Sequence, residues 1–287
     1  MERLLLYHTG ASGHGAYERH REMVLSSLRA SFEVEEYLAS NIEEGKQKII
    51  EASKSVSAIL VVGGDGTFLR VVEALLPLEK KPVLGYLNDG TLGDVGRSFG
   101  IPSSISKGLR IFLERNEREI DVGLLGDKPF VYMAAVGAYA DISYGTKRSS
   151  KKAFRRLAYY FRSLKEAFHK REVSYCILVD GKEIKGTSPF LLVLNGTHVG
   201  GFRINRNGRN DDGTLELFLT KKGPFNGLLP YFFAPKKVPC LTLESARIEI
   251  EGDETWTLDG ERGEKGSLSL SLLHKAIRVY GKKEKRR

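Results

Sequence analysis

The stretch Ala58-Ile59-Leu60-Val61-Val62-Gly63-Gly64-Asp65-Gly66-Thr67-Phe68-Leu69 decides the fold of this chain. Its β-branched run predicts a strand, its glycines a tight turn, and the residues from Phe68 onward a helix. Glycines in such a turn let backbone N–H groups approach an anion, and the helix N-terminus adds a partial positive charge. Asp65 would suit Mg²⁺, which takes one or two carboxylates, waters and phosphate oxygens. An ordinary glycine turn explains Gly-Gly alone, but it explains all of 63–67 much less well.

The first part of the chain alternates predicted strands with predicted helices. The strands are expected at 4–9, 33–39, 58–62 and 82–87, and the helices at 16–32, 43–55, 67–76 and 105–115. This alternation predicts a parallel sheet covered by helices. In such a sheet a ligand binds beyond the carboxyl ends of the strands. Loops rich in Gly, Ser or Thr follow three of the strands, and they predict a nucleotide site at one rim: 9–15, 63–67 and 88–94.

From about Ile120 onward the pattern becomes β, apart from the segment 147–171 and a short stretch at 225–233. The stretch 173–184 predicts a hairpin with Asp180-Gly181 as its two-residue turn. Further strands are expected at 190–194, 214–220, 240–243, 246–250, 255–258, 267–272 and 276–280. We therefore expect an α/β chain: an N-terminal parallel-sheet nucleotide-binding domain and a C-terminal antiparallel β-sandwich-like domain. The expected ranges are 1–120, 121–280 and a basic tail at 281–287, with the charged stretch 114–119 at the boundary.

Composition sets wide limits on the function. The chain has 287 residues, of which 41% are hydrophobic, and its apolar runs are all shorter than the roughly 20 residues of a membrane span. The N-terminal apolar run is too short for a signal peptide. The prediction is a cytoplasmic protein of two domains. The spacing of the two cysteines and six histidines does not suggest a zinc site.

The net charge of +9 is concentrated in one segment. Between Lys147 and Arg171 there are ten Lys or Arg residues against one acid, Glu166. Apolar residues recur there at helical spacing, which predicts a basic amphipathic helix. Such a helix could dock on an anionic membrane surface or bind nucleic acid. It could equally pack its apolar face on the protein and leave its cations in solvent.

Several short motifs occur together along the chain. They are Gly63-Gly64-Asp65-Gly66-Thr67, Gly90-Thr91 with Asp94 and Arg97, Ile120-Asp121-Val122-Gly123, Asn195-Gly196 with Gly200-Gly201, Asp212-Gly213 with Leu215, and Asp259-Gly260-Glu261. In this combination the chain resembles the diacylglycerol kinase catalytic-domain family, particularly its soluble bacterial lipid kinases. The resemblance implies phosphoryl transfer from ATP, with Mg²⁺, to a lipid hydroxyl, diacylglycerol above all. It also implies a cleft between the two domains.

The resemblance implies a role for individual residues. Asp65, Asp94 and Asp121 would be the acids near metal and phosphates, and Glu261, with Asp259 beside it, would accept the proton of the substrate hydroxyl. A second, structural Mg²⁺ would bind Asp212 and the main-chain carbonyls of Arg209 and Thr214. The nucleotide would contact Thr9, Gly10, Ala11, Ser12, Gly13, Ser40, Gly63, Gly64, Asp65, Gly66, Thr67, Phe68, Leu69 and Thr91. Spacing alone favours simple turns at Glu261 and Asp212, and a surface ion pair at Asp121.

The chain departs from the family pattern at two places. His8-Thr9-Gly10 stands where the first loop usually begins with Asn-Pro, and Gly93 replaces the usual asparagine before Asp94. The segment 82–88 with 90–93 also looks like NAD kinases, which share the loop at 63–67, but Asp259-Gly260-Glu261 fits lipid kinases better. A catalytically weak membrane-binding module is the other alternative. The expected partners are a lipid substrate and an anionic membrane surface; nucleic acid is not expected, and an exposed sheet edge could support a homodimer.

Overall fold

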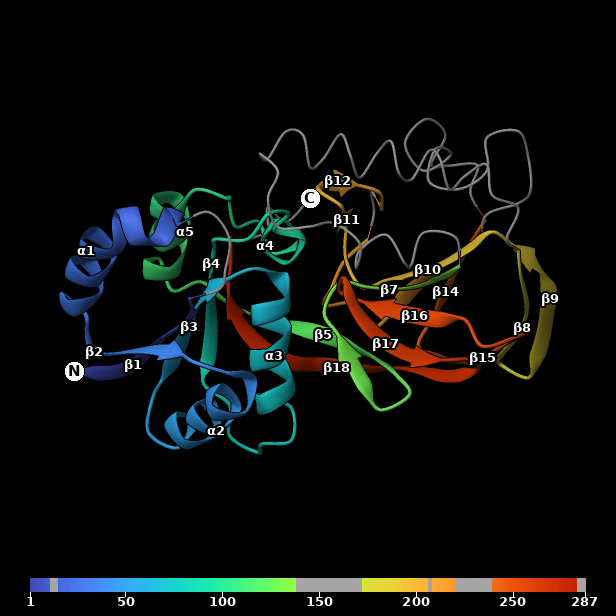
Figure 1. Cartoon of the computed structure of the whole chain (residues 1–287), viewed down its shortest axis with the longest axis horizontal. Helices are drawn as coiled ribbons and strands as arrows, with labels where there is room; N and C mark the ends of the chain where they lie inside the picture. The colour runs from blue at the N-terminus through green and yellow to red at the C-terminus, as the bar shows by residue number, and fades with distance from the viewer. Residues whose placement is uncertain (11–14, 138–171, 206–207, 220–238, 283–287) are drawn as a thin grey trace. The chain divides into compact units, whose positions relative to one another are not determined.

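The computed structural model describes residues 1–10, 15–137, 172–205, 208–219 and 239–282 (Figure 1). The chain divides into two compact units. Unit 1 comprises Met1–Asp121 and the residues from Lys275 onward, and unit 2 comprises Val122–His274. The expected ranges had left 275–280 with the β-rich domain. These residues join unit 1 because Val279 pairs in parallel with Leu84 and the Gly281 N–H donates to the carbonyl of Asn116.

Unit 1 is built on a parallel sheet with the strand order β2-β1-β3-β4-β18, which confirms the predicted nucleotide-domain fold. Its strands are β1 (Glu2–Thr9), β2 (Phe32–Ala39), β3 (Ala58–Gly63), β4 (Val83–Asn88) and the end of β18 (Leu268–Tyr280). Its helices are α1 (Ala16–Arg29), α2 (Ile42–Ser53), α3 (Asp65–Leu75), α4 (Asp94–Ser98) and α5 (Ile105–Leu113). The expected helix 16–32 was three residues too long, because Phe32 is buried as the first residue of β2.

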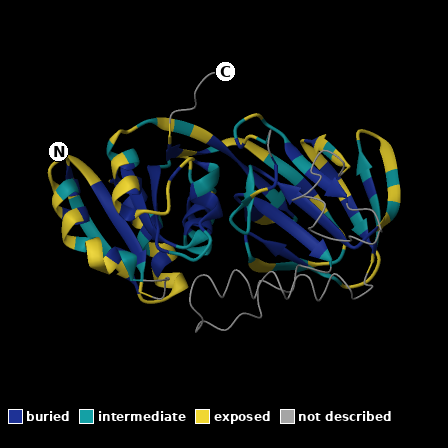
Figure 2. Ribbon diagram, turned by 90° about the horizontal axis from the view of Figure 1, so that it is seen from above, coloured by how far each residue is buried: buried dark blue, intermediate teal, exposed yellow. Residues whose placement is uncertain are grey.

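Helices cover both faces of this sheet (Figure 1). On one face α1 and α5 form a core with β1, β3 and β4. The buried residues of α1 are Tyr17, Val24, Leu25 and Leu28, which follow helical spacing. On the other face α2 packs beside α3. Figure 2 shows the result: the strands of the unit are buried, and the outer faces of its helices are exposed.

Unit 2 is a sandwich of two antiparallel sheets, as predicted. One sheet has the order β18-β15-β8-β9, with β5 beside β18 and β6 beside β5; the other has the order β14-β13-β10-β7-β16-β17. Their bounds are β5 (Glu117–Leu125), β6 (Lys128–Phe130), β7 (Met133–Gly137), β8 (Val173–Val179), β9 (Lys182–Ser188), β10 (Phe190–Leu194), β13 (Leu215–Leu219), β14 (Cys240–Leu243), β15 (Ser245–Ile250), β16 (Thr255–Leu258) and β17 (Glu261–Lys265). A separate small ribbon pairs β11 (His198–Val199) with β12 (Phe202–Arg203). Residues of both main sheets interdigitate in one core around Trp256.

In unit 2, the hairpin turn predicted from its residue types is confirmed. Asp180 and Gly181 have φ angles of 49° and 72°, as the predicted two-residue hairpin turn requires. One expectation was wrong: the strands expected at 267–272 and 276–280 are one strand, β18, which passes through Lys275 at a φ of 50°. Glu117, within the stretch 114–119 expected at the boundary, is the first residue of β5, and the division between the units falls between Asp121 and Val122. The segments 147–171 and 225–233 lie outside the described residues. In the described part of the chain, no helix is long and apolar enough to cross a membrane.

Candidate active site

Three loops of unit 1 meet at the carboxyl-terminal edge of its sheet. The strand order places β2 and β3 on opposite sides of β1, so the connections diverge there, which is where open α/β sheets bind ligands. Thr9 Oγ1, at the end of β1, lies 3.4 Å from Thr67 Oγ1. The loop after β4 reaches the same place, because a Cβ added to Gly90 would lie 2.5 Å from Gly64 Cα. We call residues 9–10, 63–67 and 88–94 the rim.

The turn between β3 and α3 depends on its glycines. A Cβ added to Gly63 would lie 2.7 Å from Thr67 Cβ, closer than side chains tolerate. Gly64 precedes α3 in an extended conformation, and its carbonyl accepts hydrogen bonds from the N–H groups of Thr67 and Phe68. The first turn of a helix leaves N–H groups without helical partners, and the helix dipole adds positive potential there. This end of α3 is therefore suited to an anion such as phosphate.

Asp65 fixes the loop that follows β4. Its Oδ2 accepts hydrogen bonds from the N–H groups of Gly93 and Asp94, and its Oδ1 accepts one from Val95, each at 3.1 Å. The Tyr86 hydroxyl lies 3.4 Å from Oδ1, but its single proton also faces the carbonyl of Gly63, which is closer at 3.2 Å. Burial raises the pKa of Asp65, and the three N–H donors partly offset this rise. A carboxylate has about four acceptor positions, and the three backbone donors occupy three of them.

Gly93, one of the two departures from the family pattern, has a structural reason. Its φ is 68°, in the left-handed region, and a Cβ there would overlap the side-chain amide of Asn88. Asn88 Oδ1 accepts a hydrogen bond from the Gly90 N–H at 2.9 Å and lies 3.3 Å from the Tyr86 hydroxyl oxygen. The side chain of Asn88 thus occupies the space that a side chain at position 93 would need. The rim keeps an amide side chain, but on a different residue.

Two further acids proposed for the chemistry are also buried in unit 1. Asp94 is fully buried as the first residue of α4. Asp121 is fully buried on β5, and its Oδ1 accepts a hydrogen bond from the Lys275 N–H at 2.7 Å. Asp89, which the sequence analysis did not single out, accepts a hydrogen bond from the N–H of Ala16 at 2.9 Å and so ties the start of α1 to the rim.

The other predicted nucleotide contacts differ in what they can offer. Ser40 follows β2 beside the end of β1, where Thr9 pairs with Ala39, and its hydroxyl donates to the Glu44 carboxylate. Phe68 and Leu69 are buried in α3, so at this rim they could offer backbone rather than side-chain contacts. Ala11, Ser12 and Gly13 lie outside the described residues.

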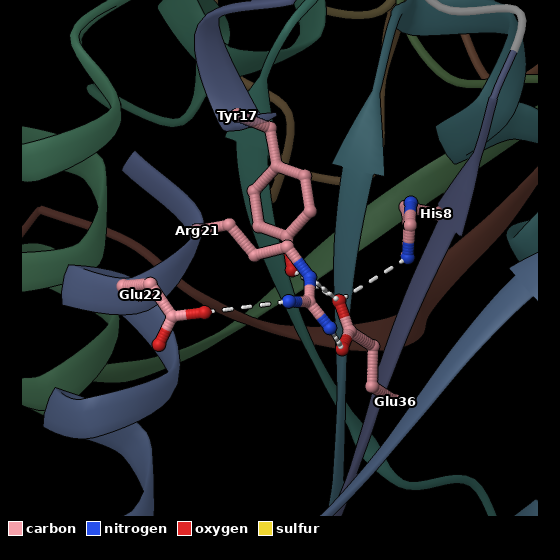
Figure 3. A network of polar contacts seen from close by, with 5 residues as sticks. All are labelled: His8, Tyr17, Arg21, Glu22 and Glu36. Carbon is pink, nitrogen blue, oxygen red and sulfur yellow. Dashed lines mark hydrogen bonds and ion pairs between the residues drawn. The ribbon is translucent and has the colours of Figure 1, made fainter. Parts of the chain in front are cut away.

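The sequence analysis missed a polar network beside the rim (Figure 3). Glu36 on β2 accepts hydrogen bonds from the Tyr17 hydroxyl at 2.7 Å and from Arg21 Nε at 2.9 Å, and its Oε1 lies 3.4 Å from His8 Nε2. Burial raises the pKa of Glu36, but the donors from Arg21 and Tyr17 outweigh this and hold it below its usual value. Burial also lowers the pKa of His8. The network fixes the first turns of α1 to the ends of β1 and β2.

In unit 2, Asp259 and Glu261 belong to one tight hairpin. Leu258 pairs with Glu261, and the turn residues Asp259 and Gly260 have φ angles of 50° and 85°. The Asp259 side chain is buried and accepts hydrogen bonds from the backbone N–H groups of residues 131–133. Glu261 is exposed at the start of β17. The structure therefore makes Asp259 an anchor of the hairpin and presents Glu261 to solvent.

The segment 131–133 is also held from a second direction by a residue of the Asn-Gly motif. Asn195 is fully buried; its backbone N–H donates to the carbonyl of Tyr132 at 2.9 Å, and its Nδ2 donates to the carbonyl of Val131 at 3.0 Å. The motif thus serves to fix backbone in unit 2. The sequence offered no sign of these partners, which lie more than 60 positions away.

The predicted second metal site has the geometry of a turn. Asp212 Oδ1 accepts hydrogen bonds from the N–H and the hydroxyl of Thr214, at 3.2 and 3.0 Å. The Arg209 guanidinium pairs with Asp211. Sequence reasoning missed Glu216 nearby, whose pKa rises to about 7, chiefly because it is buried. Glu216 is the second residue of β13, and an acid within a strand is not marked by any turn or loop signal.

The donors available to Mg²⁺ are limited. Among the described residues, no group of three or more His, Cys, Asp or Glu could hold a metal ion. Because backbone donors occupy three of the acceptor positions of Asp65, a rim Mg²⁺ fits best as an ion held chiefly by phosphate oxygens and water, a coordination that Mg²⁺ commonly adopts. Asp212 is exposed, and a carboxylate with main-chain carbonyls is an oxygen donor set of the type that Mg²⁺ accepts.

Comparison with known proteins finds a similar family for the part of the chain that contains the rim. Residues 3–125 match the model of the diacylglycerol kinase catalytic domain. Over these residues the chain is similar to the diacylglycerol kinase family. The matched residues contain the whole rim, together with Asp65, Asp94 and Asp121. The chain is therefore a kinase, and the part that matches the catalytic domain includes the phosphate-suited edge of unit 1.

Curated relatives and a solved structure agree with the family. A diacylglycerol kinase of Bacillus subtilis (strain 168) is 28% identical over 226 residues, which cover 77% of this chain and 75% of the relative. One of Staphylococcus carnosus (strain TM300) is 26% identical over 297 residues, covering 99% and 96%. The crystal structure of a diacylglycerol kinase from Bacillus anthracis str. Sterne superposes with a TM-score of 0.84 at 22% identity, over 98% of this chain and 97% of that one. This last likeness confirms the fold.

Proposed function

We propose that this kinase transfers the γ-phosphoryl group of ATP, with Mg²⁺, to the hydroxyl group of a lipid, and that diacylglycerol is its substrate. The observation that carries the proposal is the rim: three glycine-containing loops at one sheet edge, with the N-terminus of α3 among them. Phosphoryl transfer depends mainly on positioning and charge neutralisation, which such a rim can supply. The relatives named above are diacylglycerol kinases, which supports the choice of lipid.

In this proposal the backbone of Gly63–Thr67 binds phosphate groups, and the hydroxyls of Thr9, Ser40 and Thr91 contact the rest of the nucleotide. Asp65 holds the turn at 93–95 in the shape that nucleotide binding requires. Asp94 and Asp121 are the other two acids proposed to lie near the metal and the phosphate groups. Mg²⁺, when bound, would neutralise charge on the phosphate oxygens. A second Mg²⁺ at Asp212, with the carbonyls of Arg209 and Thr214, would stabilise the turn of unit 2.

Glu261 is the proposed proton acceptor for the lipid hydroxyl. Its carboxylate is exposed and begins a strand, and the adjacent hairpin turn is fixed by Asp259. A general base must be accessible to the proton that it removes and held by a rigid element. Both conditions are met by Glu261 within unit 2, which supports this role over that of a turn residue alone.

The basic segment 147–171 is proposed to dock the enzyme on an anionic membrane surface. It lies outside the described residues, so the proposal rests on its sequence: ten cations against one acid. Each cation near such a surface contributes about 1 kcal/mol. Changing Lys151, Lys152, Arg155 and Arg156 to Glu should abolish sedimentation with vesicles that contain anionic lipid. Undiminished sedimentation would instead mean that these cations are solvated and do not contact lipid.

The test of the function is transfer of labelled phosphate from ATP, with Mg²⁺, to diacylglycerol in mixed micelles. Other hydroxylated lipids are assayed alongside, and NAD is assayed in a parallel reaction. Label in diacylglycerol would support the proposal, and label in a different lipid would change its substrate. Label only in NAD would identify an NAD kinase. Absence of label in every acceptor, with vesicle binding retained, would favour a catalytically weak membrane-binding module.

A further inference from the structure

A polar cavity lies in unit 1 at the edge of the parallel sheet opposite the rim. Its volume is about 460 Å³. It is lined by the residues that lead into β3 and β4, by the first residues of β1 and β5, and by the end of β18: among them Lys54, Ser57, Lys80, Lys81, Arg115 and Arg278. The rim occupies the carboxyl ends of the same strands. This cavity, at their amino ends, is therefore separate from the proposed nucleotide site.

The lining of this amino-edge cavity carries five cations and two acids. Both arginines are compensated: Arg115 donates to both carboxylate oxygens of Glu2 at 3.1 and 3.2 Å, and Arg278 Nη1 donates to Glu117 at 3.1 Å. Lys54, Lys80 and Lys81 make no ion pair with any residue that the structure describes. The cavity therefore has an uncompensated charge of +3 from three lysines.

The paired groups give the cavity a fixed frame. The Arg115 guanidinium lies over the Phe32 ring at 4.4 Å, and Arg278 Nη2 also donates to the carbonyl of Lys81 at 3.1 Å. The Ser57 hydroxyl donates to Glu2 at 3.0 Å. Because the arginines are already engaged, the lysines are the groups left to bind a ligand. Long lysine side chains can adjust to a phosphate group as mobile point charges.

We propose that this cavity binds a phosphorylated small molecule through Lys54, Lys80 and Lys81. Glu2 and Glu117 share the cavity and would repel any anion, so a singly charged carboxylate would gain little there. A ligand with two or more phosphate charges gains from all three lysines. The volume is within the range of small-molecule sites and exceeds what one phosphate ion needs. The ligand class is thus a compact polyphosphate or a phosphorylated metabolite.

Calorimetric titration of the full chain with inorganic pyrophosphate, without nucleotide, tests the site. The variant K54Q/K80Q should bind at least about tenfold more weakly, equivalent to about 1.4 kcal/mol. The matched control is K46Q/K107Q, which removes the same charge from exposed positions on α2 and α5 outside the cavity. The control should keep the affinity of the unchanged protein. K80Q alone, in the connection before β4, serves if the double variant does not fold.

Two outcomes would overturn the proposal. Equal weakening in K54Q/K80Q and K46Q/K107Q would mean that pyrophosphate senses only the net charge. Unchanged affinity in K54Q/K80Q would place the phosphate elsewhere, for example on the rim. Vesicles of phosphatidylcholine, with and without phosphatidic acid, then distinguish the source of the phosphate group. Pyrophosphate binding without vesicle binding identifies a free metabolite, whereas vesicle binding lost in K54Q/K80Q but kept in K46Q/K107Q identifies a lipid headgroup.

Discussion

Replacing Asp65 by Asn tests whether this carboxylate acts by holding the turn at 93–95. Asn keeps the size of the side chain but has a single oxygen. The most favourable arrangement places that oxygen where Oδ2 was, so that it keeps the bonds from Gly93 and Asp94. The new NH₂ group then faces the N–H of Val95, and that hydrogen bond is lost. The Tyr86 hydroxyl can adapt, because it can accept as well as donate.

The expected cost follows from these bonds. Hydrogen bonds to a charged group contribute about 1.5–3 kcal/mol and neutral ones about 0.5–1.5 kcal/mol. The variant loses one charged bond and turns two others into neutral ones, so the free energy of unfolding should fall by about 2–4 kcal/mol. Locally, the amides of 93–95 should exchange about 30- to 700-fold faster, since 1.4 kcal/mol corresponds to a factor of ten. Lipid phosphorylation should fall in parallel, because the rim loses its shape.

Hydrogen exchange by mass spectrometry over 88–98, with a chemical denaturation curve, measures both effects. The control is D89N on the same rim. Asp89 accepts one N–H bond, from Ala16, which an Asn oxygen can keep, so the cost should stay below about 1 kcal/mol. Unchanged exchange at 93–95 in D65N would refute the anchoring role. Faster exchange with full turnover would show that this turn does not take part in transfer.

Three other substitutions test separate parts of the site. E261Q should lower kcat about 100- to 10,000-fold without changing the melting temperature, as loss of a general base does; a smaller loss would remove Glu261 from that role. G93A should lower stability by about 2 kcal/mol, from the left-handed backbone and the overlap with Asn88; a wild-type melting temperature would contradict that packing. Burial lowers the pKa of His8, so below about pH 6.5 the unfolded chain binds a proton before the folded one, and stability falls as pH drops from 7 to 5. H8Q should show a smaller fall in melting temperature over this range than the wild type or the exposed-histidine control H20Q, and an equal fall in H8Q would disprove the assignment.

The architecture of both units could be predicted because its signals are local. Apolar periodicity marked the strands of the parallel sheet, and Asp180-Gly181 specified a hairpin by its backbone preference. The position of the rim followed from one topological rule, that ligands bind where parallel strands end. The error at β18 has the same origin: Lys275, at a φ of 50°, interrupts the pattern locally although the strand continues.

What could not be predicted depends on partners far away in the sequence. Glu36 follows Glu35 and would be taken from its charge for a solvent-exposed residue, yet Tyr17, Arg21 and His8 converge on it. The role of Asn88 depended on a left-handed glycine five positions later. The amino-edge cavity collects residues from five separate segments. Periodicity and turn propensity carry no information about such long-range contacts, which only the packed fold creates.

Asp65 and Asp259 show why a motif aspartate can be misread. Each lies next to a glycine in a turn, and the sequence motif around each predicted a catalytic or metal-binding role. In the structure each carboxylate is a receptor for three consecutive backbone N–H groups, 93–95 in unit 1 and 131–133 in unit 2. A carboxylate is the strongest hydrogen-bond acceptor for consecutive backbone N–H groups that lack other partners. Burying such N–H groups without any acceptor lowers the stability of the fold. The need for an aspartate at these two positions therefore follows from backbone satisfaction alone, so that loss of activity on mutating either one would not by itself make it a metal ligand or a base.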